Sequence, residues 1–161
     1  QVHIQYSENS KEYYEISVSD GNVLTMVNAS NKEWTDYIGG KPSAEDRKIV
    51  LQVPTALLDT VTLSTTNEDI SLPVLAVTGS IDISTNGGNI TFESLDVGNT
   101  LTLTAKNGDI SGTVVGSYDD FAIQSEIKKG DSNLPDNKDS GDKTLKVSSN
   151  NGDVNIEFVA K

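Results

Sequence analysis

The sequence predicts an all-β fold, a single-stranded parallel β-solenoid whose coils are about 20 residues long. Two observations predict it: apolar side chains recur at a strict interval, and Asn-Gly or related turn residues recur between them. A short unit that repeats in this way can bury its apolar face only by stacking on its neighbours. The leading apolar columns are Val61, Ile81, Leu101 and Phe121, and then Leu63, Ile83, Leu103 and Ile123.

Polar residues separate the two columns, which is typical of a strand with one buried and one solvated face. A further apolar column, Ile70, Ile90 and Ile110, follows seven residues after the second. An odd spacing cannot keep both columns on one face of a straight strand, so we expect a turn between them. Asn107-Gly108-Asp109 has the turn chemistry required. A charge in an inward column, as in Leu103→Asp, should therefore unfold the stack.

Five coils are expected, starting near Val61, Ile81, Leu101, Phe121 and Leu145. The last interval is 24 residues, and the polar segment 130–142 accounts for the surplus as a loop leaving the fourth coil. We expect the fifth coil to close the stack with residues 156–159. Glu68 stands where later turns have Gly, and it would be strained if that position demanded a positive φ.

An antiparallel β meander or roll is the alternative chain path, with each Asn-Gly turn closing a hairpin. A hairpin explains the turn chemistry, but only stacking explains why each column keeps its character across four consecutive units. A leucine-rich repeat has a similar period, yet its Leu-x-x-Leu pattern is missing here. The solenoid is therefore the favoured interpretation.

The first third of the chain is less regular. We expect one domain, 1–161, with irregular N-terminal coils or a cap at 1–55 and regular repeats at 56–161. Ile16 and Val23 again differ by seven around an Asp-Gly-Asn turn, so this segment is interpreted as degenerate coils that cap the stack. Trp34 and Tyr37 lie in an expected loop. They are candidates for stacking on a neutral sugar, although such aromatics more often pin a loop to the core.

Charge limits the partners. The chain has 24 acidic and 12 basic residues, a net charge of −12 that repels nucleic acid and anionic lipid. It lacks an apolar run of 18 residues, so we expect no membrane insertion by this fragment. Because it opens inside a strand-like segment without Met, we interpret it as part of a longer protein whose remainder holds an anchor. Zero cysteines exclude thiolate metal sites and disulfides.

Several segments resemble bacterial domains of unknown function that carry the label adhesin. They are the repeats at 101–110 and 145–154, the segment 130–135 and the strand 49–54. The resemblance covers essentially the whole chain. It implies a β-solenoid-like domain behind a membrane anchor on the envelope of Gram-positive bacteria, hence an extracellular or cell-envelope location; the sequence is also compatible with the cytoplasm. It implies no catalytic residues.

The turn residues form one more column, which raises the question of calcium. Ca²⁺ needs several oxygen ligands, and Asp69, Asp109 and Asp153 are the candidates, with Asp131 a further member of the column. Asn89 separates Asp69 from Asp109 by two strand spacings, roughly 9.6 Å, which is too far to share an ion directly. We therefore expect no metal site, and acids that accept hydrogen bonds from backbone N–H groups in the turns.

No catalytic residue and no cofactor are expected. His3 is the only histidine and has no partner in the pattern. Asp119-Asp120 could form an acid pair with Asp96 or Glu93, as in glycosidases, but a solvated rim is the simpler interpretation. A single arginine, Arg47, disfavours a polysaccharide lyase.

The expected function is a non-catalytic cell-envelope domain that presents an extended β surface to a protein or a glycan. A structural spacer or sensor ectodomain of a membrane-anchored protein is the alternative, and a β-helix carbohydrate-active enzyme is supported by architecture alone. A cleft with two carboxylates about 5–10 Å apart would favour the enzyme, and a flat Ser/Thr-rich face would favour contact. Exposed end strands leave an edge-strand dimer open.

Overall fold

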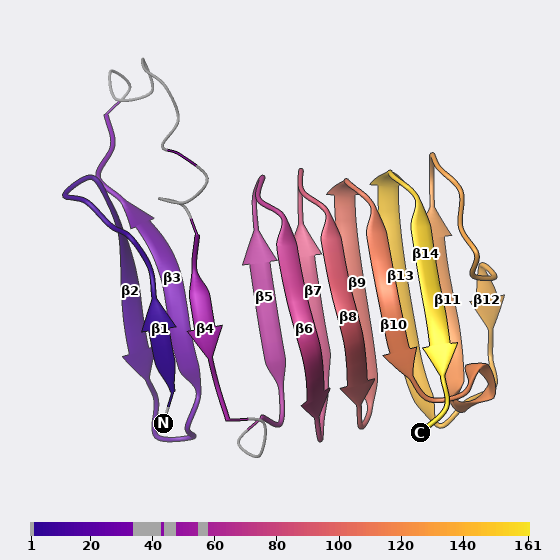
Figure 1. The fold of residues 1–161 in the computed structure, drawn as a ribbon. Coiled ribbons are helices and arrows are strands. Elements are labelled where there is room, and N and C mark those ends of the chain that lie inside the picture. Colours follow the sequence, from indigo (N-terminus) through magenta and orange to yellow (C-terminus); the bar gives the residue numbers. More distant parts are fainter. Residues whose placement is uncertain (1, 34–42, 44–47, 55–57) are drawn as a thin grey trace. The chain divides into compact units, whose positions relative to one another are not determined.

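The computed structural model describes residues 2–33, 43, 48–54 and 58–161, and these form strands joined by short turns (Figure 1). The chain divides into two compact units, Gln1–Pro54 (unit 1) and Thr55–Lys161 (unit 2). The boundary falls where the sequence changes from irregular to regular. Whether both units belong to one domain stays a prediction.

Unit 1 consists of two antiparallel pairs. β1 (His3–Gln5) pairs with β4 (Val50–Gln52), and β2 (Glu12–Val18) forms a hairpin with β3 (Leu24–Ser30). The turn is closed by Ser19 N donating to Val23 O at 3.1 Å, with Asn22 at a φ of 57°. The interpretation of this segment as a degenerate coil is wrong, because strands on both sides of the turn pair with each other.

In unit 2 the turns after β5, β7, β9 and β13 send the chain into a second sheet, whereas β11 is followed by β12 of the same sheet. The first backbone N–H after the turn bonds to the neighbouring coil: Ile90 N donates to Asp109 O at 2.9 Å. Each of the coils that start at Val61, Ile81, Leu101 and Leu145 therefore contributes one strand to each of two parallel sheets, which confirms the solenoid over the antiparallel roll (Figure 1).

The six-stranded sheet has the order β12-β11-β13-β9-β7-β5, and the four-stranded sheet has the order β14-β10-β8-β6. The six strands of the first are β5 (Val61–Thr65), β7 (Ile81–Thr85), β9 (Thr100–Asn107), β11 (Phe121–Ile127), β12 (Asn137–Lys138) and β13 (Lys143–Asn151). The four of the second are β6 (Ile70–Val77), β8 (Ile90–Val97), β10 (Ile110–Val115) and β14 (Val154–Val159).

The order of the coils differs from the order of the chain. β13 lies between β9 and β11, and β14 pairs with β10, so the fifth coil sits between the third and the fourth. The expectation that the fifth coil closes the stack is wrong for the six-stranded sheet, where β11 and β12 lie beyond β13, and is confirmed for the four-stranded sheet, where β14 is the last strand. The connection from β10 to β11, residues 116–120, contains a 3₁₀ turn (η3, Tyr118–Asp120). It is longer than residues 78–80 and 98–99, which join the earlier coils, and it spans the position that coil five fills.

The core of unit 2 lies between the two sheets and follows the predicted columns in the first three coils. The prediction is wrong for coil four, because Ile123 and not Phe121 pairs with Leu145 and so continues the column of Leu101. Ile81 pairs with Val61 on one side and with Leu101 on the other. Leu103 is fully buried between Ile83 and Val147, so its replacement by Asp would bury an unpaired carboxylate. The fully buried apolar side chains are Ile81, Ile83, Ile90, Leu95, Val97, Leu101, Leu103, Ala105, Ile110, Val114, Phe121, Ile123 and Leu145.

Candidate functional site

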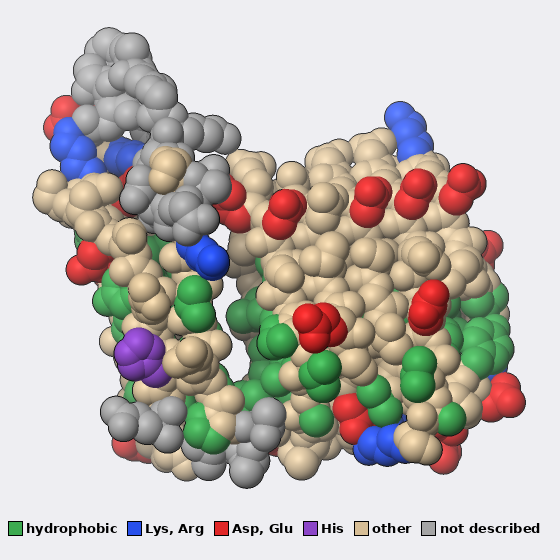
Figure 2. Space-filling model, viewed as in Figure 1, with side chains coloured by type: hydrophobic (Ala, Val, Ile, Leu, Met, Phe, Trp, Pro, Cys, Tyr) green, Lys and Arg blue, Asp and Glu red, His purple; other side chains and the backbone are tan. Residues whose placement is uncertain are grey.

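The turn column forms a continuous hydrogen-bond ladder along one edge of unit 2. Each side chain accepts a bond from the backbone N–H of its equivalent in the next coil. Asn89 N donates to Asp69 Oδ1 at 2.7 Å, and Asp109 N donates to Asn89 Oδ1 at 2.9 Å. Asp153 N to Asp109 Oδ1 and Asp131 N to Asp153 Oδ1 are both 2.8 Å. Figure 2 shows a row of acidic side chains along this edge.

The ladder places the candidate calcium ligands closer together than the order of the sequence predicts. Because coil five is inserted, Asp109, Asp153 and Asp131 occupy consecutive coils, and Asn89 separates only Asp69 from Asp109. One oxygen of Asp69, Asp109 and Asp153 is already bound to a backbone N–H. In the part of the chain that the structure describes, no three His, Cys, Asp or Glu side chains are grouped to hold a metal ion. The absence of a metal site stays a prediction.

Glycines line the same turns because successive coils approach closely. A Cβ on Gly108 would lie 2.1 Å from Gly88 O, and one on Gly152 would lie 2.1 Å from Gly108 O. Glu68 occupies this position in the first coil, where no earlier coil of unit 2 meets it. Asn22 is the one non-glycine with a positive φ among the described residues. The close approach of backbone atoms in successive coils therefore explains why Gly recurs at this turn position, and Glu68 does not need a positive φ there.

The outer face of the six-stranded sheet is rich in hydroxyl groups. We call it the hydroxyl face; it consists of Thr62, Ser64, Ser84, Thr102, Thr104, Thr144 and Ser148, which the strand registers align in rows. Ser84 Oγ donates to Ser64 Oγ at 3.0 Å, so neighbouring coils are linked across the row. The charged side chains that share these rows are Asp82, Lys146 and Glu126.

One end of the hydroxyl face is hollowed. After β11 the chain folds back, β12 pairs antiparallel with β11, and Ser125 N donates to Asp136 O at 2.9 Å. This places the segment around Asp136 as a wall beside β11. The resulting open depression of about 240 Å³ is lined by Thr102, Leu103, Thr104, Gln124, Ser125, Glu126, Asp136, Lys146, Val147 and Ser148.

The candidate acid pair is not assembled. Asp96 forms ion pairs with two lysines: its Oδ2 lies 2.6 Å from Lys161 Nζ, and its Oδ1 lies 3.7 Å from Lys143 Nζ. Asp120 Oδ2 accepts from the backbone N–H of Ser117 at 2.8 Å, and this bond, with a second from the Ser117 side chain, holds the pKa of Asp120 below its ordinary value of 3.8. Asp96 is thus paired with lysines and Asp120 with the Ser117 backbone, so the two side chains do not form the pair of carboxylates that a glycosidase uses.

The remaining candidates do not form a site among the described residues. His3 is exposed on β1. Trp34, Tyr37 and Arg47 lie outside the described residues. Glu93 lines a second open depression on the outer face of the four-stranded sheet, with Ser71, Thr91 and Ser111.

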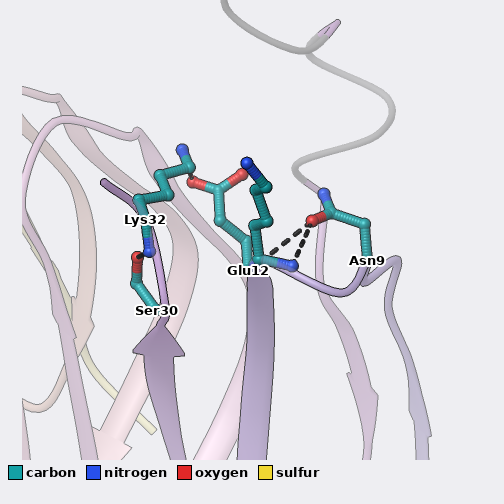
Figure 3. A network of polar contacts seen from close by, with 5 residues as sticks. Asn9, Glu12, Ser30 and Lys32 are labelled. Atoms are coloured by element: carbon teal, nitrogen blue, oxygen red, sulfur yellow. Dashed lines mark hydrogen bonds and ion pairs between the residues drawn. The ribbon is translucent and has the colours of Figure 1, made fainter. Parts of the chain in front are cut away.

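A polar network holds the open end of the unit 1 hairpin (Figure 3). Asn9 Oδ1 accepts from the backbone N–H groups of Lys11 at 2.9 Å and Glu12 at 3.0 Å, and Glu12 forms an ion pair with Lys32. Lys32 N donates to Ser30 Oγ at 3.2 Å. The network joins the start of β2 to the residues after β3, which is a structural role.

Two features of this region do not follow from the repeat pattern of the sequence. The wall at Asp136 depends on β12 folding back over β11, and the pairing of Asp96 with Lys143 depends on coil five lying inside the stack. The five-residue connection at 116–120 is the signal that could have indicated the altered order. No helix among the described residues has the length and apolarity to cross a bilayer.

A comparison with protein families finds one matching description. A family model described as Toastrack DUF4097 matches residues 1–111, which include unit 1 and most of the first three coils of unit 2. Comparisons with curated proteins and with solved structures gave no match.

Proposed function

The chain belongs to the Toastrack DUF4097 family, a family of unknown function, and from that premise we propose that it is a non-catalytic, adhesin-like domain of the cell envelope. Its hydroxyl face contacts a protein or a glycan. The observation that carries the proposal is the regular array of hydroxyl groups on one face of a rigid parallel sheet, with few charges among them.

The distribution of charge supports this choice of face. The whole chain has a net charge of −12, and acidic side chains concentrate on the turn edge (Figure 2). On the hydroxyl face Asp82 is offset by Lys146, and Glu126 lies 3.9 Å from Lys128 Nζ. A nearly neutral face is the part of such a molecule that an uncharged partner can contact at the lowest electrostatic cost, whereas nucleic acid is repelled by the molecule as a whole.

The state of the carboxylates supports a domain without a catalytic site. Asp96 is paired with lysines, and Asp120 is held ionised by Ser117. The depression beside Asp136 is open and shallow, and it is smaller than the pockets of about 300–1,000 Å³ that usually bury a small-molecule ligand. Contact with a larger surface fits this shape better than the enclosure of a substrate.

The proposed location is extracellular or in the cell envelope, with attachment through an anchor outside this fragment. A structural spacer or sensor ectodomain is the second candidate function. Its supporting observation is the uninterrupted ladder from Asp69 to Asp131, which ties every coil of unit 2 to the next. A spacer needs rigidity along the stack and no ligand on the hydroxyl face.

A dimer through β5 belongs to the same proposal. β5 ends the six-stranded sheet, and its sequence Val-Thr-Leu-Ser-Thr carries no charge and no proline, the usual protections of an edge strand. The opposite end of the sheet is covered by β12. Sedimentation over a range of concentrations should show a dimer that Ser64→Lys abolishes; a monomer at every concentration would contradict this part.

Binding experiments test the contact function. The full chain is incubated with a glycan array and with envelope fractions of Gram-positive bacteria. The double variant Ser84→Glu/Thr104→Glu adds two charges to the hydroxyl face, and Thr91→Glu/Ser111→Glu adds two to the outer face of the four-stranded sheet. We expect the first variant to lose binding at least tenfold and the second to retain it. Equal loss in both, or no binding by the wild type, would contradict the proposal.

A further inference from the structure

The position of the fourth coil makes it a cover for the fifth. β11 pairs with β13 through seven register positions, from Phe121 with Lys143 to Ile127 with Ser149, and its outer side pairs with β12. β13 in turn lies between β11 and β9. The first strand of coil five, although it follows coil four in the chain, is therefore enclosed on both sides, whereas β14 is the last strand of the four-stranded sheet.

Side chains and turns complete the cover over the second half of coil five. Asn133 Nδ2 donates to Ile156 O at 2.8 Å, and Ile156 N donates to Asn133 Oδ1 at 3.0 Å, so one side-chain amide pairs with β14 in place of a strand. Gly152 N donates to Lys129 O at 3.0 Å, and Asp131 N donates to Asp153 Oδ1. Leu134 is buried against this end of the core.

Hydrogen bonds from Lys138 hold the covering segment to the start of β11. Lys138 Nζ donates to Phe121 O at 2.8 Å and to Ser140 O at 2.6 Å, so the returning segment is tied to the first residue of β11. The same ammonium lies 5.0 Å from the centre of the Tyr118 ring. Residues 116–120 are the only covalent link between the three-coil stack and this segment.

We propose that residues 116–142 act as a strap that closes over coil five. Coil four can open while coil five stays docked, because it lies at the end of the stack. Coil five cannot leave its place between β9 and β11 unless coil four has first moved away. The chain thus makes the strap before the coil that it encloses, and the strap docks last.

Amide hydrogen exchange tests this order, because it measures the opening of each coil separately. If coil five opens only after coil four, the equilibrium constant for its opening is the product of two constants: one for the opening of coil four and one for the subsequent opening of coil five. The variant Asn133→Ala weakens the strap alone. We expect the exchange rates of β11, β13 and β14 to rise by one common factor, with β7 unchanged. A rise in β11 alone would overturn the proposal.

The reverse perturbation gives the opposite pattern. Asn151 Nδ2 donates to Asn107 Oδ1 at 2.7 Å and joins coil five to coil three. Asn151→Ala should raise exchange in β13 and β14 and leave β11 unchanged, because coil four already opens alone. An equal rise in β11 would mean that both coils open as one body, and it would contradict the strap.

A crosslink supplies an independent measurement, since the chain has no cysteine of its own. Ala122 and Thr144 are register partners in β11 and β13, so Ala122→Cys/Thr144→Cys would tie the strap to coil five. Oxidation should slow exchange in β13 and β14 at least tenfold and reverse on reduction. The control pair Thr62→Cys/Asp82→Cys joins coils one and two and should leave β13 unchanged. Slowing by both pairs, or by neither, would count against the proposal.

Discussion

Leu145 of β13 is the register partner of Leu101 of β9, although the chain builds the coil of Phe121 between them. Both leucines are fully buried. The first strand of the C-terminal repeat is therefore an internal part of the six-stranded sheet, and stability should depend on it accordingly.

Truncation of Leu145 tests that relationship. Leu145→Ala should lower the free energy of unfolding by about 2–5 kcal/mol, because a cavity opens between β9 and β11. Lys146→Ala, at the neighbouring exposed position, should change it by less than about 0.5 kcal/mol. Urea denaturation of both variants measures the difference. A cost below about 1 kcal/mol for Leu145→Ala would show a loosely packed end coil instead.

The glycine column supplies a second prediction. A Cβ on Gly108 would lie 2.1 Å from Gly88 O, and a backbone carbonyl inside a parallel stack cannot move aside. Gly108→Ala should therefore cost at least about 2 kcal/mol in thermal or urea unfolding. Gly87→Ala is the control, since its Cβ would meet the exposed side-chain oxygen of Asn67, which can rotate away. Equal stability of the two variants would mean that the coils separate easily at the turn.

The repeat period predicted the strands of unit 2 and the inward columns, because like residues stack on like. It could not predict the coil order. The period of 20 places Phe121 beside Leu101, and Leu145 has the same apolar character, so the sequence pattern accepts either residue there; in the structure Leu145 takes the place and Ile123 follows it. Only the length of the connection at 116–120 distinguishes the two, and length is a weak signal when a loop can simply bulge.

The sequence predicted part of the candidate site as well. The turn acids accept backbone hydrogen bonds as their chemistry indicates, and alternation predicted a wet, Thr-rich face. Asp136 could not be placed beside that face, because its position follows from β12 folding back over β11. The Asp-Gly-Asn turn of unit 1 has the same composition whether it joins a hairpin or a coil, so residue types alone could not decide there.

Ser149 provides a test of buried polarity. Its hydroxyl is the one buried side-chain polar atom without a partner among the described residues, since its register neighbour in β9 is Ala105. Ser149→Ala should leave stability unchanged or raise it by up to about 1 kcal/mol, because no hydrogen bond is lost. Thr85→Val is the control: the Thr85 hydroxyl accepts from Gly88 N at 3.1 Å, and its removal should cost roughly 1–3 kcal/mol. A large loss for Ser149→Ala would imply a bound water there.

Asp120 predicts a specific acid dependence. Because the Ser117 N–H lowers its folded pKa below 3.8, folding favours the ionised form. The resulting stabilisation is present above the unfolded pKa and is lost as the pH falls through the lowered folded value. Asp120→Asn should therefore reduce Tm near pH 6, and its difference from the wild type should shrink as the pH falls below 3.8. A difference that stays constant over that range would contradict the assignment.

Asp109 separates the structural function of the turn ladder from a metal-binding one. Its Oδ1 accepts from Asp153 N at 2.8 Å, and either an Asp or an Asn side chain can do this, as Asn89 does one coil earlier. Asp109→Ala should therefore lower the free energy of unfolding by about 1 kcal/mol, the usual net value of one hydrogen bond. Asp109→Asn should retain the wild-type value or exceed it, because it keeps the acceptor and removes repulsion from Asp153 in the next coil. Melting in millimolar Ca²⁺ and in chelator should give the same Tm for the wild type. A calcium-dependent increase in Tm that Asp109→Asn abolishes would instead identify the consecutive acids as ligands. Such a rise in Tm, and its loss when one carboxylate becomes an amide, would both require Ca²⁺ to bind the carboxylate oxygens of the turn column.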